Sequence, residues 1–256
     1  MRTVKEKLFE KGGRRLNFFG LSNKGKVRGN NEDYFHIPQS KEEVQLFIVA
    51  DGMGGENAGE VASCLAVSSI ALHVISNYQE INDIPLLLRQ AINNANKNVY
   101  QTAKSDKNYN HMGTTVVCAI IKDDIVYVAN VGDSRCYLVN ENNLQQISID
   151  HSFVQEMIDK GLLSVDEAKN HPNKNLITRA IGVDRFVGVD IFSKPFKKGD
   201  KLLLATDGLT GMIDKEKISS IINEETDCKK AVERLIDSAN EAGGKDNITA
   251  VLICND

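Results

Sequence analysis

The sequence predicts an α+β fold in which two mainly antiparallel β-sheets pack together and helices cover them from outside. Three observations indicate this class. Apolar segments of strand length alternate irregularly with longer segments of helical period, which does not match the regular strand–helix repeat of a parallel sheet. Two pairs of neighbouring strands are joined too tightly for anything but an antiparallel pair. The 256 residues fit one large domain or two small ones.

The strands are predicted from short runs rich in β-branched and aromatic residues, bounded by turn residues. They are residues 18–22, 33–38, 44–50, 114–121, 125–131, 136–139, 187–192, 201–205 and 248–254. Residues 122–124 and 141–143 are short polar connections, and each predicts a hairpin between its flanking strands.

The helices are predicted from their capping residues. Asn57 with Glu60 opens a helix that reaches about residue 76, and its apolar positions nearly surround the axis, so we expect it to be buried. Asp83 and Pro85 open a second helix that reaches about residue 104. The remaining helices begin at a capping box of Ser164 and Glu167, at Asp214 and at Thr226, and the last stops at Gly243 and Gly244.

Composition and charge exclude several classes of protein. The formal net charge of -4 gives no general attraction to nucleic acid or to an anionic membrane. No segment is expected to span a membrane, and the N-terminus lacks the apolar core of a signal peptide. The five cysteines are dispersed without CxxC spacing, which argues against a disulfide framework and against a zinc site, so a cytoplasmic location is expected.

The N-terminal residues 1–17 are interpreted as a basic leader that is helical before Gly12, followed by a single domain at residues 18–256. The leader is either a solvated tail or a docking segment for a partner or a membrane surface. A monomer is the default expectation.

Four apolar strands meet an aspartate beside glycine or another small turn residue, at Asp51, Asp133, Asp207 and Asp246. One Asp-Gly after a strand usually marks only a turn. Buried carboxylates are costly unless they are paired or bind a cation, and divalent cations such as Mg²⁺ prefer oxygen ligands. Four of them, with the triplet 31–33, therefore predict one metal site at an edge of the sandwich.

Eight collinear segments resemble the PPM/PP2C protein phosphatases, in particular the compact bacterial type. The segments are RGNNED (28–33), VADGMGGENAGEVAS (49–63), MGTT (112–115), NVGDSRCYL (130–138), DHSFVQEMIDKGLL (150–163), HPNKNLITRAIG (171–182), LLLATDGL (202–209) and GGKDNIT (243–249). The resemblance covers about residues 19–253. It implies a four-layer α-β-β-α sandwich with a metal centre at one end, and a flap beside it at about residues 150–181.

The resemblance also implies a role for each matching position. Asp51 bridges two metal ions, Asp207 and Asp246 complete the ligands of the first ion, and the Gly52 carbonyl with Glu32 serves the second. Asp133 and Asp207 hold a third, weaker ion, and Asp33 and Asn247 support the ligands. The expected ions are Mn²⁺ or Mg²⁺, which agrees with an all-oxygen ligand set.

The reaction implied is the hydrolysis of phosphoserine and phosphothreonine in proteins by direct attack of a metal-bridging water, without a phosphoenzyme. Arg28 is expected to bind the phosphate as a fork of paired donors. Expected partners are phosphorylated proteins and a cognate serine/threonine kinase that the enzyme opposes. Met53 stands where eukaryotic relatives often carry a histidine, so the general acid stays open between a metal-bound water, His151 and another group of the flap.

Two other functions stay open. The fold could serve as a regulatory binding module, although such proteins typically lose metal-ligating acids and this chain retains them. The same site could also act on small phosphate esters, and turnover of a phosphopeptide against small esters would separate these readings. The flap either selects substrates or gates access, or is a surface excursion without substrate contact.

Overall fold

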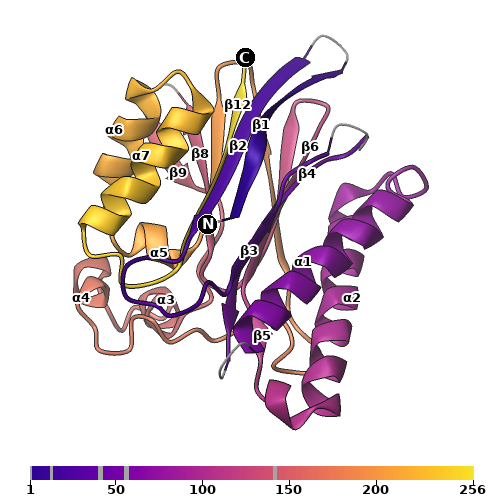
Figure 1. Ribbon diagram of the computed structural model, residues 1–256, viewed down its shortest axis with the longest axis vertical. Coiled ribbons are helices and arrows are strands. Elements are labelled where there is room, and N and C mark those ends of the chain that lie inside the picture. Colours follow the sequence, from indigo (N-terminus) through magenta and orange to yellow (C-terminus); the bar gives the residue numbers. More distant parts are fainter. Residues whose placement is uncertain (1, 12–13, 40–42, 55–57, 141–142) are drawn as a thin grey trace.

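The fold is a sandwich of two antiparallel sheets between two layers of helices, which confirms the predicted α-β-β-α class (Figure 1). The computed structural model describes residues 2–11, 14–39, 43–54, 58–140 and 143–256, with side chains from residue 16 onward. In Figure 1, α6 and α7 cover one side of the sandwich and α1 and α2 the other.

The first sheet has the strand order β1-β2-β12-β11-β8-β9, and every neighbouring pair is antiparallel. Its strands are β1 (Arg2–Lys11), β2 (Arg14–Asn23), β8 (Arg135–Asn140), β9 (Asn143–Gln146), β11 (Lys201–Ala205) and β12 (Ile248–Asn255).

The second sheet has the order β10-β7-β6-β4-β3, also antiparallel throughout, and β5 pairs with the end of β4. Its strands are β3 (Asp33–His36), β4 (Gln45–Met53), β5 (Gly113–Thr114), β6 (Val116–Lys122), β7 (Ile125–Val131) and β10 (Asp190–Pro195).

Several of the helices begin at the side-chain caps that the sequence predicts. They are α1 (Ala58–Asn77), α2 (Ile84–Ser105), the single 3₁₀ turn η1 (Lys107–Tyr109), α3 (Phe153–Asp159), α4 (Val165–Lys169), α5 (Asp207–Thr210), α6 (Lys215–Glu224) and α7 (Cys228–Glu241). The caps at Asp83 and Asp214 and the capping box at Ser164 are confirmed. Asp227, rather than Thr226, caps α7, because its carboxylate accepts from two backbone N–H groups. Asn57 lies outside the described residues.

Three apolar layers hold the elements together. The layer between the sheets contains Phe18 and Phe47, whose rings meet edge to face with centroids 5.2 Å apart. A second layer joins α1 and α2 to the β3–β10 sheet, and a third joins α6 and α7 to the β1–β9 sheet. Both sheets are therefore clamped on both faces, which fixes the positions of the strand ends.

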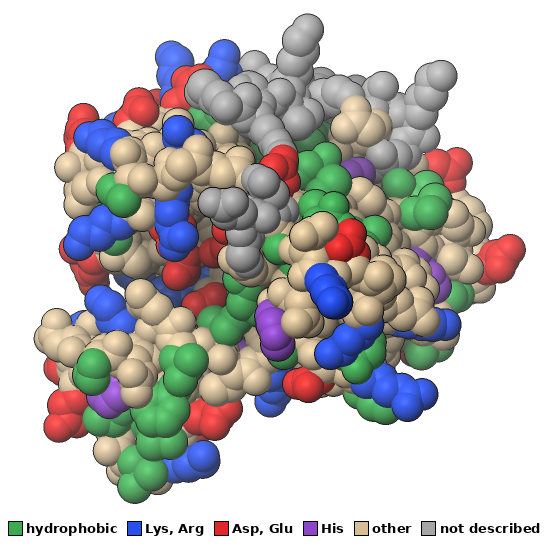
Figure 2. All heavy atoms as spheres, turned by 60° about the horizontal axis from the view of Figure 1, so that its bottom comes forward, with side chains coloured by type: hydrophobic (Ala, Val, Ile, Leu, Met, Phe, Trp, Pro, Cys, Tyr) green, Lys and Arg blue, Asp and Glu red, His purple; other side chains and the backbone are tan. Residues whose placement is uncertain are grey.

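The sequence elements that carry the predicted site residues come together at one end of the sandwich. This end holds the last residues of β4, the turn after β7, the start of α5 and the turn before β12, with α3 and α4 of the flap beside them (Figure 1). Figure 2 looks onto this end and shows acidic side chains lying in a recess between protruding parts of the chain.

Some elements differ from the sequence prediction. The leader was expected to be helical before Gly12, but residues 2–11 form β1, which pairs with β2 and extends the sheet at its edge. The predicted boundary at residue 17 falls within β2. The single strand expected at 114–121 is two strands, because the backbone N–H of Thr115 leaves the ladder and donates to Asp51 instead.

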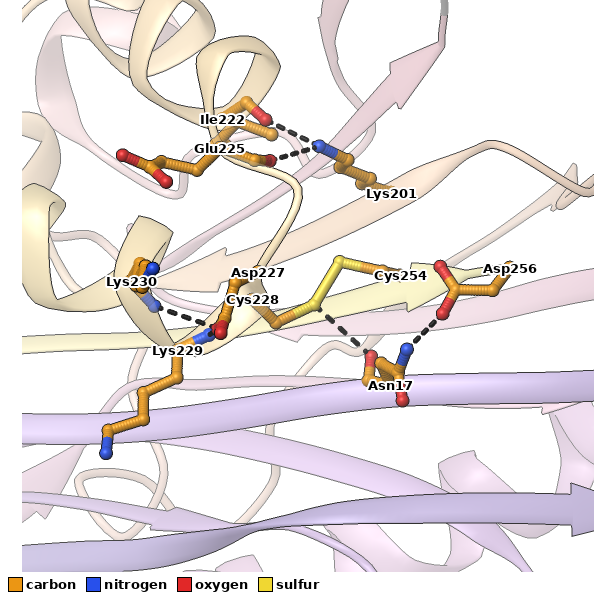
Figure 3. Close-up of a disulfide and its surroundings, with 10 residues drawn as sticks. All are labelled: Asn17, Lys201, Ile222, Glu225, Asp227, Cys228, Lys229, Lys230, Cys254 and Asp256. Carbon is orange, nitrogen blue, oxygen red and sulfur yellow. Dashed lines mark hydrogen bonds between the residues drawn. A yellow bond between two sulfur atoms is a disulfide. The ribbon is translucent and has the colours of Figure 1, made fainter.

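The cysteine prediction was wrong in one respect. Cys228 at the start of α7 and Cys254 on β12 form a disulfide, and Asn17 of β2 lies beside it (Figure 3). They are 26 residues apart in sequence, and only the packing of α7 on the sheet brings them together. Cys118 on β6 and Cys136 on β8 are free and buried, and they pack as small apolar residues of the core.

Helix α1 qualifies the expectation of no membrane span. By length and composition it could cross a membrane, with a mean hydropathy of 1.6 in its most apolar window. Of that window, 56% is buried within the protein, against β4 and α2, as in the core helix of a soluble fold. The apolar residues predicted around most of this helix are therefore explained by its packing against both β4 and α2.

Truncating Phe47 tests the layer between the sheets. Phe47 is fully buried, so Phe47→Ala should lower the free energy of unfolding by about 3–5 kcal/mol in urea titrations. The control is Leu72→Ala on the outer face of α1, where the side chain is 70% exposed and the change should stay below about 0.5 kcal/mol. Equal losses in the two variants would contradict this view of the core.

Candidate metal centre

Asp51 is held by its own backbone at the end of β4. It lies opposite Asp33 of β3 in the sheet register. Its carbonyl accepts hydrogen bonds from the hydroxyl of Thr114 at 2.8 Å and from the backbone N–H of Thr115 at 2.9 Å, and its N–H donates to the Thr115 hydroxyl at 3.0 Å. With both backbone groups fixed, the direction of the carboxylate is set by the strand.

Gly52 and Gly59 allow the Glu32 loop to lie directly against α1. A Cβ atom on Gly52 would stand 2.1 Å from the carbonyl oxygen of Gly59, and one on Gly59 would stand 2.7 Å from the carboxyl group of Glu32. The N–H of Gly52 donates to the Glu32 carbonyl at 3.2 Å. Only glycine fits at both positions, which brings the predicted ligands Gly52 and Glu32 side by side.

Asp33 joins three elements below the site. It is fully buried, and its Oδ2 accepts hydrogen bonds from the hydroxyls of Thr249 at 2.6 Å and Thr206 at 3.0 Å. Thr206 directly precedes Asp207, and Thr249 lies on β12. These contacts fit the supporting role predicted for Asp33, since its carboxylate positions the segments that carry other acids.

Asn247 connects the turn before β12 to the Glu32 loop. Its Oδ1 accepts from the backbone N–H of Glu32 at 2.8 Å, and its Nδ2 donates to the carbonyls of Lys24 and Asn30 at 2.9 and 2.8 Å. Its own N–H donates to Asp246 Oδ1 at 2.8 Å. One amide therefore holds the loops of two predicted ligands, which fits its predicted support of the site.

Asp207 and Asp133 complete the acidic group. Asp207 is the first residue of α5, and its Oδ1 is buried without a hydrogen-bond partner among the described residues. Asp133 follows β7, and the Ser134 hydroxyl beside it shares a 2.7 Å hydrogen bond with the Thr115 hydroxyl that also holds Asp51. A buried, unpaired carboxylate oxygen is unfavourable unless another group binds it.

The carboxylates influence one another's ionisation. Burial, and then the negative charges of Asp33 and Asp207, raise the pKa of Asp51 well above its ordinary value of 3.8. Burial, and then the charge of Asp246, raise the pKa of Asp207. Burial, and then the charge of Asp207, raise the pKa of Asp133 to about 7. The group therefore binds a positive charge readily, whether a proton or a metal ion.

A divalent cation fits this donor set. In the described part of the chain, no three Asp, Glu, His or Cys side chains are already close enough together to hold one ion. The fit rests instead on the unpaired buried oxygen of Asp207 and on the shared negative charge of the group. Hard cations with oxygen ligands, such as Mn²⁺ and Mg²⁺, would satisfy both.

Residues 26–252 match the family described as Protein phosphatase 2C. The chain belongs to this family. The serine/threonine phosphatase stp of Listeria welshimeri is 41% identical over 234 residues, which are 91% of this chain and 93% of the relative.

Two solved structures show the same likeness in space. The S. agalactiae serine/threonine phosphatase superposes with a TM-score of 0.87 and 34% identity, covering 94% of this chain and 100% of that chain. The catalytic domain of the phosphatase PstP, in complex with 2 manganese ions, gives a TM-score of 0.83 and 31% identity, covering 94% and 98%. The chain is thus a serine/threonine protein phosphatase of the PP2C type, as the sequence segments predicted.

Arg28 of the phosphatase lies at the margin of the acidic group. Its Nη2 donates to Asp246 Oδ2 at 2.7 Å, and its side chain is 51% exposed. This hydrogen bond, together with the charges of Asp246 and Asp51, raises the pKa of Arg28 despite its partial burial. The guanidinium is therefore fixed at the site entrance with donors left for an anion.

The phosphatase gives His151 contacts that do not suit a general acid. Its side chain is 4% exposed, Nδ1 accepts from the backbone N–H of Gly132 at 3.0 Å, and Nε2 lies 3.1 Å from Asp190 Oδ2. Burial lowers the pKa of His151, and because Nδ1 accepts from Gly132, the ring proton is on Nε2 and faces Asp190. Met53 ends β4 and has no proton to give. We assign proton donation to neither.

Sequence reasoning gave no role to the threonines that position the aspartates. Thr115, Thr206 and Thr249 each donate to, or accept from, an acidic residue of the site. A signal was available for two of them, because Thr206 and Thr249 lie within three residues of a motif aspartate, in ATDG and DNIT, whereas Thr115 reaches Asp51 only across the sheet. Hydroxyls next to predicted carboxylates are candidates for such contacts.

Acid should stabilise the metal-free phosphatase. Burial raises the pKa of Asp33 and Asp133 to about 7, against 3.8 for an ordinary aspartate. Their contribution to stability is therefore fully present below 3.8 and lost as the pH rises through about 7. We expect the Tm of metal-stripped protein to fall between about pH 4 and about pH 7 in calorimetric scans.

The control for this prediction is Asp133→Asn, which removes one of the carboxylates with a raised pKa and should reduce the fall. Saturating Mn²⁺ should reduce it in the unaltered protein as well. An unchanged slope in the variant would show that other groups cause the pH dependence.

Proposed function

We propose that this phosphatase hydrolyses phosphoserine and phosphothreonine esters by direct attack of water, with two divalent cations held by the acidic group, and that it opposes a serine/threonine kinase. The observation that carries the proposal is the buried set of mutually interacting carboxylates at one end of the sandwich, with Asp207 Oδ1 unpaired among the described residues. The manganese-bound PstP relative supports metal dependence.

The residues that would hold the ions come from five separate segments. Asp51 would bridge the pair, Asp207 and Asp246 would complete the first ion's protein ligands, and the Gly52 carbonyl with Glu32 would serve the second. Asp133 with Asp207 would bind a third, weaker ion. When bound, the ions would supply an activated water and neutralise the charge that develops on the phosphoryl oxygens.

The protein's own contribution is position and charge. The Thr114 and Thr115 contacts fix the Asp51 backbone, and the Asn247 amide fixes the Glu32 loop. Arg28 offers its remaining donors to the phosphate at the entrance of the site. The predicted site residues include no serine, cysteine or histidine nucleophile, and their aspartates would be engaged as metal ligands, which supports direct hydrolysis over a phosphoenzyme.

Proteins are the proposed substrates, since the relatives are serine/threonine phosphatases. Turnover of a phosphothreonine peptide should exceed that of a small aryl phosphate at equal concentration. A preference for the small ester would favour the alternative hypothesis that the enzyme acts on small phosphate esters. Complete inactivity of folded, metal-loaded protein on both would favour a regulatory module.

Replacing Asp51 tests the metal centre. Metal-stripped protein should gain activity on a phosphothreonine peptide when Mn²⁺ is added, and Asp51→Asn should lower kcat at least about a thousandfold, because the bridge between the ions is lost. The matched control is Asp237→Asn on the exposed side of α7, which should keep the full rate. Near-normal turnover in Asp51→Asn would refute the assigned centre.

Replacing Arg28 tests phosphate binding. Arg28→Ala should raise KM for the phosphopeptide about tenfold with a smaller effect on kcat, because the lost donors bind the phosphate before and during the reaction. Arg28→Lys keeps the charge but lacks the paired donors, so its KM should lie between those of the unaltered protein and Arg28→Ala. An unchanged KM in Arg28→Ala would show that the guanidinium only pairs with Asp246.

A further inference from the structure

The turn that carries Asp133 has an unusual backbone. Gly132 directly precedes Asp133 and has a φ of +106°, in the region that favours glycine. A Cβ atom on Gly132 would also stand 2.6 Å from the side chain of Thr115. The direction of the Asp133 carboxylate therefore depends on what holds Gly132 in this conformation.

His151, at the start of the flap, binds both backbone groups of Gly132. The N–H of His151 donates to the Gly132 carbonyl at 3.0 Å, and the N–H of Gly132 donates to His151 Nδ1 at 3.0 Å. Both bonds are buried or nearly so, since the His151 side chain is 4% exposed. Because Nδ1 accepts, the ring proton is on Nε2, which faces Asp190 Oδ2 at 3.1 Å.

The same histidine is joined to the other end of the flap. Its carbonyl accepts from the N–H of Thr178 at 2.8 Å. Arg179 Nη1 lies 3.1 Å from Asp190 Oδ1 and 3.3 Å from His151 Nε2. Asp190 lies opposite Asn130 in the β10–β7 pair, so it is fixed by the sheet. Both ends of the flap thus meet at His151, through its backbone and its side chain.

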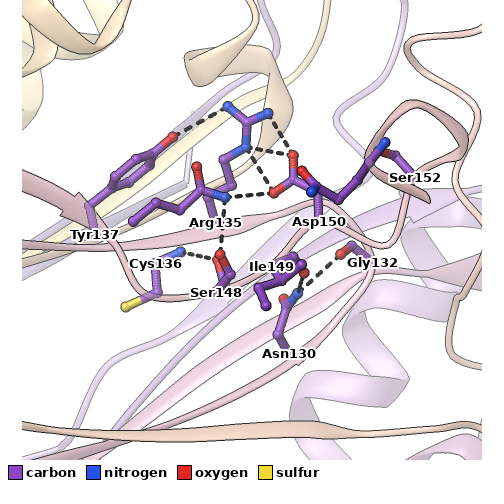
Figure 4. Close-up of polar contacts among 11 residues, drawn as sticks. Asn130, Gly132, Arg135, Cys136, Tyr137, Ser148, Ile149, Asp150 and Ser152 are labelled. Atoms are coloured by element: carbon purple, nitrogen blue, oxygen red, sulfur yellow. Dashed lines mark hydrogen bonds and ion pairs between the residues drawn. The ribbon is translucent and has the colours of Figure 1, made fainter. Parts of the chain in front are cut away.

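Two further contacts reinforce this junction (Figure 4). The Asp150 carboxylate faces the Arg135 guanidinium, with N–O distances of 2.6 to 3.1 Å. The Asn130 amide donates to the carbonyls of Gly132 and Ile149, at 3.1 and 2.9 Å. Residues on both sides of Asp133 therefore bind the first residues of the flap, since Asn130 bonds to Ile149 and Arg135 to Asp150.

We propose that His151 is a positioning residue for Asp133: through Nδ1 it sets the Gly132 conformation that aims the Asp133 carboxylate at the metal centre, and it couples this turn to the flap. The inference rests on the proposed function and deepens it. It assigns to His151 an effect on metal binding rather than on proton transfer. The ligand whose binding His151 would affect is the divalent cation that Asp133 would hold.

Two conservative substitutions separate the two ring nitrogens. In His151→Asn, the amide oxygen stands close to the place of Nδ1 and can still accept from Gly132. In His151→Gln, the amide nitrogen stands close to the place of Nε2 and can still reach Asp190, but nothing accepts from Gly132. Asp190→Asn is the matched control, since it alters only the Nε2 side.

The test is titration of metal-stripped protein with Mn²⁺, followed by calorimetry and by turnover of a phosphothreonine peptide. We expect His151→Gln to weaken the weakest Mn²⁺ site at least about tenfold and to raise by the same factor the Mn²⁺ needed for half-maximal kcat, while KM changes less than about threefold. His151→Asn and Asp190→Asn should stay within about threefold of the unaltered protein in both measurements.

A double variant tests whether His151 acts through Asp133. In Asp133→Asn, adding His151→Gln should cause no further change in the Mn²⁺ requirement, because the group that it positions is already lost. Additive effects, or equal effects of His151→Asn and His151→Gln, would overturn the proposal and leave a general packing role. If His151→Gln does not fold by circular dichroism, His151→Ser, which is too short to accept from Gly132, carries the same contrast.

The outcome also separates this proposal from the proposed function. Unaltered protein that shows no response to Mn²⁺ in calorimetry or in turnover would refute the metal-dependent function itself. A normal Mn²⁺ response in the unaltered protein, with no contrast between the His151 variants, would refute only the positioning role.

Discussion

Repulsion among carboxylates that are buried at one end of a sandwich is the constraint on which the rest of this structure depends. Asp51, Asp133 and Asp207 each have a raised pKa, first because burial removes water and then because their neighbours carry the same charge. Such a group persists only if the backbone leaves it no alternative arrangement. The scaffold supplies this rigidity, since both sheets are covered by helices and the strand ends cannot move apart without disrupting three apolar layers.

Short polar side chains transmit this rigidity to the acids. Thr115 holds Asp51 and contacts Ser134 beside Asp133, while Asp33 accepts from hydroxyls on the segments of Asp207 and β12. Each contact joins segments that are distant in sequence. Removing one of these side chains would therefore displace several acids at once. The effects of neighbouring substitutions on stability and activity are for this reason not expected to be additive.

Sequence alone could predict the sheets, most helices and the acids, because these depend on local patterns: apolar runs, capping side chains and aspartates at strand ends. It failed where the outcome depended on packing. The basic leader looked helical, yet residues 2–11 pair as β1 with β2. Cys228 and Cys254 gave no sequence signal, since only the placement of α7 on the sheet brings them together. The contacts of His151 were also out of reach, because they join the flap to a turn 19 residues away.

The stem of the flap has a consequence for how such enzymes can diversify. Two isolated bridges, Thr114 with Ile181 and Ser152 with Ile177, close the excursion where it leaves the sandwich. The residues between these bridges can thus be lengthened, shortened or exchanged while the stem keeps its geometry, at a loop-closure cost that grows only slowly with length. We therefore expect that the flap can be exchanged as a unit, so that one hydrolytic centre is given a different exterior without being rebuilt.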